Sequence, residues 1–457
     1  MGGKDWISEL PDDLLCRILS FLPTTIAVRT TVLSKRWNNV WTCVPNLDLD
    51  CQRDFVPLDC QRDFVPYYPL CDHDRFDMLV DRVLRSRDSS DIKKFRLRTC
   101  VTDLACVEGW ICTAVRRNVV ELDLHLDAGH EEKYTFVLPR SFFSCKTLKV
   151  LKLYGSLCIS VPYAPPASRC FPSLKCLLVS VKSPGCKSLM EKVLTNCPVL
   201  EDLIICTNIH QSHAPIYMMK VSAPELKTLR ISSSIEKYVR KNVLIDAPKL
   251  EKLDVRTHVQ GVSNYSLDAR SLVNANIVFD DYYYTGRDSL PEHAIALLAG
   301  ISNVKYLSLE TSRLRAGDLP FFPNLNQLKV VVDHSKYWDF LAVLLENAPN
   351  LEDLDLEDGT MRDEKHSKLQ WKPPKVVPNC LSSHLKTITL RPFRGQKIDM
   401  ELAEYLLNNG HLLEKMTLHA SYYWRTLDVG SALLMFNRAS MTCQVEYNRE
   451  NSAWDID

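Results

Sequence analysis

The stretch Pro224-Glu-Leu-Lys-Thr-Leu-Arg-Ile231 decides the fold, because its pattern returns many times along the chain. The pattern is a proline, then an apolar residue two positions on, then a second and a third apolar residue after gaps of two residues and one residue. The last two apolar side chains are two positions apart, so they point to the same side of a β-strand. One short strand cannot bury that side alone, whereas stacked copies form a parallel sheet with a continuous core.

The pattern recurs from about residue 90, beginning with Ile92-Phe95-Leu97 and ending with Leu413-Met416-Leu418. Between Val119 and Leu250 the first apolar residues of successive copies are 24 to 29 positions apart, which is the spacing typical of leucine-rich repeats. Apolar stripes with helical spacing lie between the strands, for example at residues 76–84 and 341–345. The sequence therefore predicts an α/β solenoid with a parallel sheet on its concave face.

A different pattern precedes the repeats, in residues 5–49, and it predicts three short helices. Pro11 occupies the expected first helical position, Pro23 ends the first helix, and Ser34 is expected to cap a helix that carries Trp37 and Trp41. Leucine and isoleucine recur at spacings of three and four in the first helix and form one apolar stripe. Helices this short cannot bury all of these side chains among themselves, so the remaining apolar surface needs a partner.

This segment resembles the F-box of plant F-box proteins with leucine-rich repeats, through Leu10-Pro11, Leu14-Leu15, Ile18-Leu19, Leu22-Pro23 and the run Val32-Leu-Ser-Lys-Arg-Trp37. The resemblance implies docking to a Skp-type adaptor and, through it, to a cullin-based ubiquitin ligase. An ordinary N-terminal helical cap on a larger domain is the alternative reading. The residues expected to contact or support contact with the adaptor are Leu10, Pro11, Leu14, Leu15, Ile18, Leu19, Leu22, Leu33 and Trp37.

A second resemblance lies near the end of the chain, at residues 368–420. Trp371-Lys-Pro-Pro, Val377-Pro378 and Phe393-Arg-Gly395 resemble the FBD segment of many plant F-box repeat proteins, although Leu390 and Arg391 stand where relatives usually carry tryptophan. The segment is expected to form a strand, a turn, a helix over residues 399–408 and a further strand. Such a unit would close the array and cover the exposed end of its sheet.

The fold class is therefore α/β, with an N-terminal three-helix F-box followed by a leucine-rich-repeat solenoid and closed by an FBD-type unit. The expected divisions are the F-box at 1–48, a linker at 49–70, the repeat array at 71–367, the FBD-like segment at 368–420 and a tail at 421–457. The linker contains the tandem duplication Leu49-Asp-Cys-Gln-Arg-Asp-Phe-Val-Pro57, repeated from Leu58 to Pro66. We expect residues 1–48 to be removable without unfolding the array.

Composition narrows the function classes. Basic and acidic residues both number 56, so general binding to nucleic acid or to a membrane surface is not expected. Without a signal segment or a bilayer-spanning apolar run, the 17 cysteines are expected to stay reduced in the cytoplasm, the nucleus or both. No zinc-type cysteine pair and no catalytic motif occurs, so no metal, cofactor or enzyme activity is expected.

We therefore predict a non-enzymatic substrate-recognition subunit, whose array binds an unknown target protein. A repeat scaffold, or a small-molecule sensor without ligase output, is the alternative. In each copy, the residues on either side of the central apolar residue and the residue after the last apolar residue point away from the core. Together they form a mosaic of opposite charges that suits a protein partner. Ordinary solvation of an exposed sheet is the competing explanation. The candidate target-binding residues, mostly towards the C-terminal half, are Arg230, Asp254, Arg256, Asp353, Asp355, Glu357 and Arg391.

Overall fold

The computed structural model describes residues 7, 9–55, 72–87, 90–101, 103–127, 135–155, 158–160, 171–181, 197–209, 216–235, 240–258, 265–280, 292–311, 319–332, 337–358, 373–374, 376–420, 433 and 435–449. Trp371 of the FBD-like segment and the second copy of the duplicated peptide lie outside these residues. The chain divides into two compact units: unit 1 is Met1–His213 with Met219–Thr228, and unit 2 is Ala214–Met218 with Leu229–Asp457.

Unit 1 begins with the three predicted helices, α1 (Asp12–Leu19), α2 (Thr24–Arg29) and α3 (Trp37–Val40). The 3-10 turns η1 (Thr30–Val32) and η2 (Trp41–Cys43) follow α2 and α3. Pro11 lies directly before α1 instead of at its first helical position, and Pro23 lies directly before α2. The third helix begins at Trp37 rather than just after Ser34. A proline has no N–H to donate, so it fits directly before a helix as well as inside its first turn.

The parallel sheet of unit 1 contains six strands in the order β1-β2-β3-β5-β7-β8. The middle apolar residues of the repeat triplets form one row across this sheet: Phe95, Leu122, Leu151, Leu177 and Leu203. These side chains are buried. The strands are β1 (Asn46–Asp50), β2 (Lys94–Cys100), β3 (Glu121–Asp127), β5 (Val150–Gly155), β7 (Cys176–Val181) and β8 (Asp202–Ile209).

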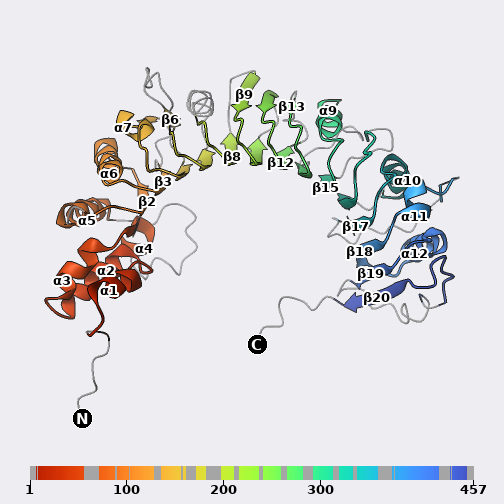
Figure 1. Cartoon of the computed structure of the whole chain (residues 1–457), viewed down its shortest axis with the longest axis horizontal. Coiled ribbons are helices and arrows are strands. Elements are labelled where there is room, and N and C mark those ends of the chain that lie inside the picture. The colour runs from red at the N-terminus through yellow and green to blue at the C-terminus, as the bar shows by residue number, and fades with distance from the viewer. Residues whose placement is uncertain are drawn as a thin grey trace, which may run out of the picture. The chain divides into compact units, whose positions relative to one another are not determined.

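The described helices α5, α6 and α7 lie on the same side of these strands (Figure 1). Their bounds are α5 (His73–Ser86), α6 (Leu104–Arg116) and α7 (Arg140–Phe143), and the short strands β4 (Thr135–Val137) and β6 (Cys158–Ser160) pair separately. In α5 the predicted stripe is confirmed, because Phe76, Val80 and Val83 are buried. The other face of the sheet carries the polar outward-pointing residues, and we call it the polar face.

The sheet starts earlier than the sequence predicts. Strand β1 pairs with β2 from Asn46 onward, across the expected division at residue 48, and helix α4 (Cys51–Phe55) lies inside the expected linker. The first strand of the array therefore continues directly from the F-box. Removal of residues 1–48 would take away part of a paired strand, and whether the array stays folded after this deletion remains a prediction.

Unit 2 repeats the same architecture, with strands in the order β10-β12-β14-β15-β16-β17-β18-β19-β20. Even the weakest sequence triplet keeps the register, because Ala275 pairs with both Leu253 and Leu307. The strands are β10 (Thr228–Ile235), β12 (Lys252–His258), β14 (Asn274–Asp280), β15 (Tyr306–Thr311), β16 (Gln327–Val332), β17 (Asp353–Asp358), β18 (Thr387–Phe393), β19 (Lys415–Ala420) and β20 (Gln444–Arg449).

Helices again cover one face of the unit 2 strands: α9 (Glu292–Gly300), α10 (Tyr337–Asn347), α11 (Asn379–Ser383) and α12 (Lys397–Asn409) (Figure 1). Strands β9 (Ile216–Ser222), β11 (Arg240–Asp246) and β13 (Tyr265–Asp268) form a separate small sheet. Helix α12 confirms the helix predicted over residues 399–408 and lies between β18 and β19, as expected for one more repeat-like unit. A reciprocal capping box between Gln396 and Asp399 fixes where α12 begins.

Candidate functional site

The first candidate site is the apolar surface of the three-helix unit. Leu14, Ile18 and Leu33 are 46%, 48% and 64% exposed, although they are aliphatic. Leu14 and Ile18 lie one helical turn apart, so they share a face of α1. Ile7, Phe21, Ile26 and Val32 are also exposed. Sequence analysis did not select these four, and their signal, apolar residues outside the main helical stripe, is weak.

The other predicted adaptor residues occupy different positions. Leu15, Leu19 and Trp37 are buried, with at most 5% of their surface exposed, so they form the core of the unit instead of its surface. Leu10 and Leu22 are half-buried, and Pro11 is exposed. The single stripe expected on the first helix is therefore two stripes, with Leu15 and Leu19 turned inward and Leu14 and Ile18 turned outward.

Ion pairs and hydrogen bonds fix this unit internally. Arg36, just before α3, donates from Nε and Nη2 to Oδ1 of Asp12 at 2.9 and 2.6 Å and to the carbonyl oxygen of Leu10 at 2.5 Å. These bonds hold the segment that follows Leu33 against the start of α1. The exposed side chains of both segments therefore belong to one neighbourhood on the surface.

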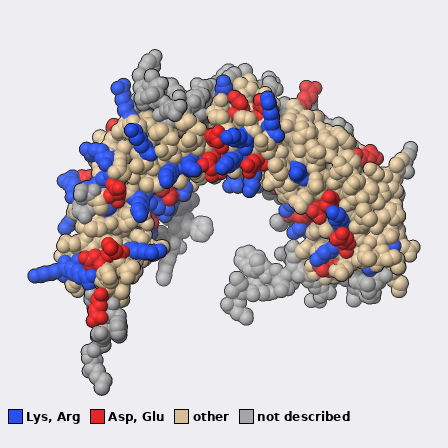
Figure 2. Space-filling model, in the orientation of Figure 1, with Lys and Arg blue, Asp and Glu red and all other residues tan. Residues whose placement is uncertain are grey.

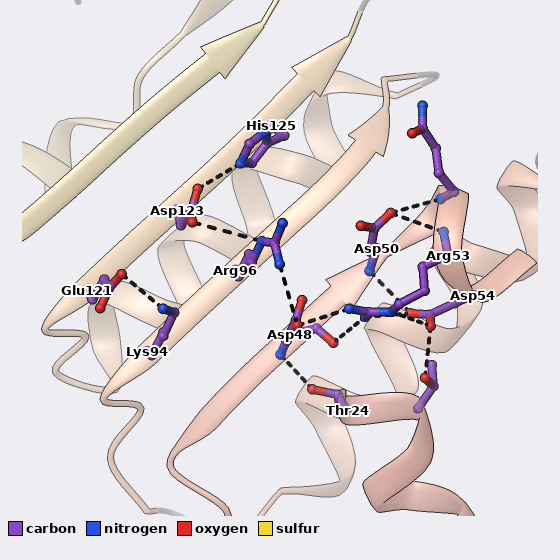
Figure 3. Close-up of polar contacts among 12 residues, drawn as sticks. Thr24, Asp48, Asp50, Arg53, Asp54, Lys94, Arg96, Glu121, Asp123 and His125 are labelled. Atoms are coloured by element: carbon purple, nitrogen blue, oxygen red, sulfur yellow. Dashed lines mark hydrogen bonds and ion pairs between the residues drawn. The ribbon is translucent and has the colours of Figure 1, made fainter. Parts of the chain in front are cut away.

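Polar contacts also join the helices to the first strand (Figure 3). Oγ1 of Thr24 accepts a hydrogen bond from the backbone N–H of Asp48 at 2.7 Å, and Thr25 donates to Asp54 at 3.0 Å. Burial alone would lower the pKa of the Arg53 guanidinium, but its hydrogen bonds to Asp54 and Asp48 raise it. Arg53 therefore stays charged and ties α4 to β1.

The second candidate site is the polar face of the sheet, and in unit 1 its charges form a ladder (Figure 3). Arg96 lies between Asp48 and Asp123, at 3.7 and 3.9 Å, and Nε2 of His125 lies 3.0 Å from Oδ1 of Asp123. The ammonium groups of Lys94 and Lys152 are each 3.1 Å from Oε1 of Glu121. Burial would raise the pKa of Glu121, but the hydrogen bonds from both lysines lower it.

In unit 2, the predicted target-binding residues point outward as expected, but most of them pair with other residues of this chain. Arg391 donates to both carboxylate oxygens of Asp355, at 3.1 and 2.9 Å, and Lys329 lies 2.8 Å from Glu357. Arg230 lies 2.8 Å from Asp254.

The two remaining candidates of this set differ from each other. Asp353 accepts hydrogen bonds from Gln327 at 3.0 Å and from Thr387. Arg256 is exposed and has no ion pair within the described part of the chain. Charges of both signs are intermixed on the surface (Figure 2), so the mosaic exists. Its role in target binding stays a prediction.

Among the described residues, no three metal-ligating side chains come together, and no helix there has the length and apolar character to cross a membrane.

These features define a class of protein: an α/β repeat protein with an N-terminal three-helix unit and a closing strand–helix–strand unit. Comparison with known families is consistent with each part. The F-box domain matches residues 7–48, the LRR repeats of the "FBD-associated F-box protein At5g56370" family match residues 107–276, and FBD matches residues 372–418.

Similar proteins from Arabidopsis thaliana cover nearly the whole chain. F-box/FBD/LRR-repeat protein At1g78750 and F-box/LRR-repeat protein 13 are each 32% identical over 91% of this chain and 89% of their own length. FBD-associated F-box protein At4g10400 is 28% identical over 97% of this chain and all of its own length. The chain belongs to the F-box/FBD/LRR-repeat proteins, which confirms both resemblances seen in the sequence.

Proposed function

We propose that this chain is a non-catalytic substrate-recognition subunit of a Skp–cullin–F-box ubiquitin ligase. Its F-box docks to a Skp-type adaptor, and its repeat array holds a target protein near the ubiquitin-conjugating enzyme that the cullin recruits. The chain supplies proximity and no bond chemistry. One observation carries the proposal: the F-box has a closed core of its own and still exposes Leu14, Ile18 and Leu33.

The exposed fractions of Leu14 and Ile18 set the size of the loss of adaptor affinity expected when they are replaced. Burying a leucine or isoleucine completely stabilises a complex by roughly 1.5 to 3 kcal/mol. Leu14 and Ile18 have 46% and 48% of their surface left to bury, so each contributes about 1 kcal/mol. Their joint removal should therefore weaken adaptor binding about thirtyfold.

A Leu14→Ala, Ile18→Ala double variant tests the docking surface, with Met78→Ala as the matched control. Met78 lies on α5 in unit 1 and is 67% exposed, but it is outside the F-box. Adaptor affinity, measured by surface plasmon resonance on the full chain, should fall for the double variant alone. Cullin should co-purify with the wild-type chain and adaptor. Unchanged affinity in the double variant, or equal loss in Met78→Ala, contradicts the proposal.

A further inference from the structure

Two neighbouring strands of the large parallel sheet differ from its other strands in the type of residue at one position. It is the outward-pointing residue between the last two buried residues of each repeat triplet. In the strands of the large parallel sheet other than β7 and β8, this residue is polar or charged: Asp48, Arg96, Asp123, Lys152, Arg230, Asp254, Asn276, Ser308, Lys329, Asp355, Thr389, Thr417 and Glu446. In β7 and β8 it is Leu178 and Ile204, and the strand register places these two side by side.

Further apolar residues surround this pair. Val150 and Cys176 are neighbours in the preceding row, and Tyr154 and Cys206 lie in the following row on either side of Ser180. All of these side chains are partly exposed. We call Val150, Tyr154, Cys176, Leu178, Ile204 and Cys206 the apolar patch.

Packing within the chain does not account for the apolar patch. The opposite face of β7 and β8 already fills the core through Leu177, Val179, Leu203 and Ile205, which are all buried. An apolar residue is not required at the outward position of a strand, because β18 and β19 carry threonine there. Apolar surface left in water is unfavourable, and a contiguous patch of it marks an interaction site.

The charges beside the apolar patch indicate what kind of partner fits it. Arg96 and Lys152 already have carboxylate neighbours in the chain, whereas Arg98 has no ion pair or side-chain hydrogen bond within the described residues. The register places Arg98 between Asp50 and His125, and His125 beside Tyr154. Asp50 accepts hydrogen bonds from the backbone N–H groups of Gln52 and Arg53. The rings of His125 and Tyr154 stack at 4.1 Å with 13° between their planes. A flat aromatic surface therefore connects the apolar patch to Arg98, a cation with which no described residue forms an ion pair.

We propose that the apolar patch anchors an extended segment of a target protein that carries an aliphatic or aromatic side chain and, towards β2, an acidic residue that pairs with Arg98. Arg98 on β2 and Leu178 on β7 are three strand spacings apart, or about 14 Å. An extended chain covers that distance in about four residues. The inference rests on the proposed function in one respect: the bound protein is taken to be the target of the ligase.

The test uses the full-length chain in complex with its adaptor and a displayed library of random peptides as the probe. Selected peptides should share an apolar residue with an acidic residue about four positions away. Synthetic copies should bind the Leu178→Thr, Ile204→Thr variant on the order of tenfold more weakly or worse. Threonine occupies this position in other strands and keeps strand propensity, so the variant should fold, and circular dichroism checks this.

Two further variants sharpen the result. Val331→Thr changes a partly exposed apolar residue on the polar face of unit 2 and should leave peptide binding unchanged. Arg98→Glu should reverse the charge preference, so that selection on this variant enriches basic residues in place of acidic ones. A reversal of this kind cannot come from a general loss of stability.

Three results would overturn the inference: no peptide enriched above background, peptides that bind the double threonine variant as tightly as the wild type, or binding lost equally in Val331→Thr. Adaptor affinity is measured on the same proteins. The apolar patch variants should keep it, because they lie outside the F-box. If the wild-type chain selects the expected peptides but binds no adaptor, the ligase function fails and the binding site stands.

Discussion

Two adjacent leucines of α1 should respond in opposite ways to the same substitution. Leu15 is completely buried and Leu14 is 46% exposed. Replacing a buried leucine with alanine removes apolar contacts and leaves a cavity, at a cost of about 2 to 5 kcal/mol. Taking 3 kcal/mol, Leu15→Ala lowers the ratio of closed to open F-box about 150-fold. Leu14→Ala leaves a helix-favouring residue on a surface and should change stability by about 0.5 kcal/mol or less.

Hydrogen–deuterium exchange of the α1 amides, followed by mass spectrometry on the full chain, measures this ratio directly. Leu15→Ala should speed exchange by a factor on the order of a hundred, whereas Leu14→Ala should leave it near the wild-type rate and lower adaptor affinity. Saturating adaptor should restore protection in Leu15→Ala, because a ligand that binds only the folded state stabilises it. Lost adaptor binding in Leu15→Ala with α1 still protected would refute the reasoning and make Leu15 a contact residue.

Two further outcomes follow from the ion pairs. Hydrogen bonds from Lys175 and Lys227 lower the pKa of Glu201 to about 2, so this carboxylate stabilises the fold above its unfolded-state pKa and loses that contribution as the pH falls towards 2. Lys175→Gln should raise the pKa, seen in a carboxyl NMR titration, and a value still near 2 would contradict this. Asp355→Asn breaks the ion pair with Arg391; the two side chains are 28% and 33% exposed. This substitution should lower the free energy of unfolding in urea by about 1 kcal/mol. Strict additivity of its effect with that of Arg391→Gln would show that the pair contributes nothing.

The sequence predicts the repeat fold well, because a strand with side chains on alternating faces leaves few arrangements for a recurring triplet. Even Ala275, in the weakest copy, aligns with Leu253 and Leu307. The start of the sheet is harder to predict, although Val44, Leu47 and Leu49 have the triplet spacing and are buried, because strand β1 continues directly from the F-box.

The candidate sites were predicted less completely, for two physical reasons. A helical stripe in a sequence does not show which side of it is covered, so Leu14 and Leu15 looked alike. Charged partners also depend on side-chain reach as well as register. Arg391 lies opposite Glu357 in the strand register, yet its guanidinium binds Asp355, while Glu357 pairs with Lys329. Only the three-dimensional structure shows this diagonal arrangement.

The pairing of charges also bears on where a target binds. A partner that uses Asp355 or Arg391 must first break a bidentate ion pair, so its own charge replaces an existing interaction and gains little net free energy. A partner that covers Leu178 and Ile204 releases water from apolar surface and breaks no internal pair, and Arg98 adds a charge with which no described residue forms an ion pair. Charged pairs in unit 2 are then better suited to excluding wrong partners than to holding the right one. On this reasoning, charge reversal at Asp353, Asp355 and Glu357 disturbs the chain's own contacts before it reports on a target, and substitution at Leu178 and Ile204 is the more direct experiment.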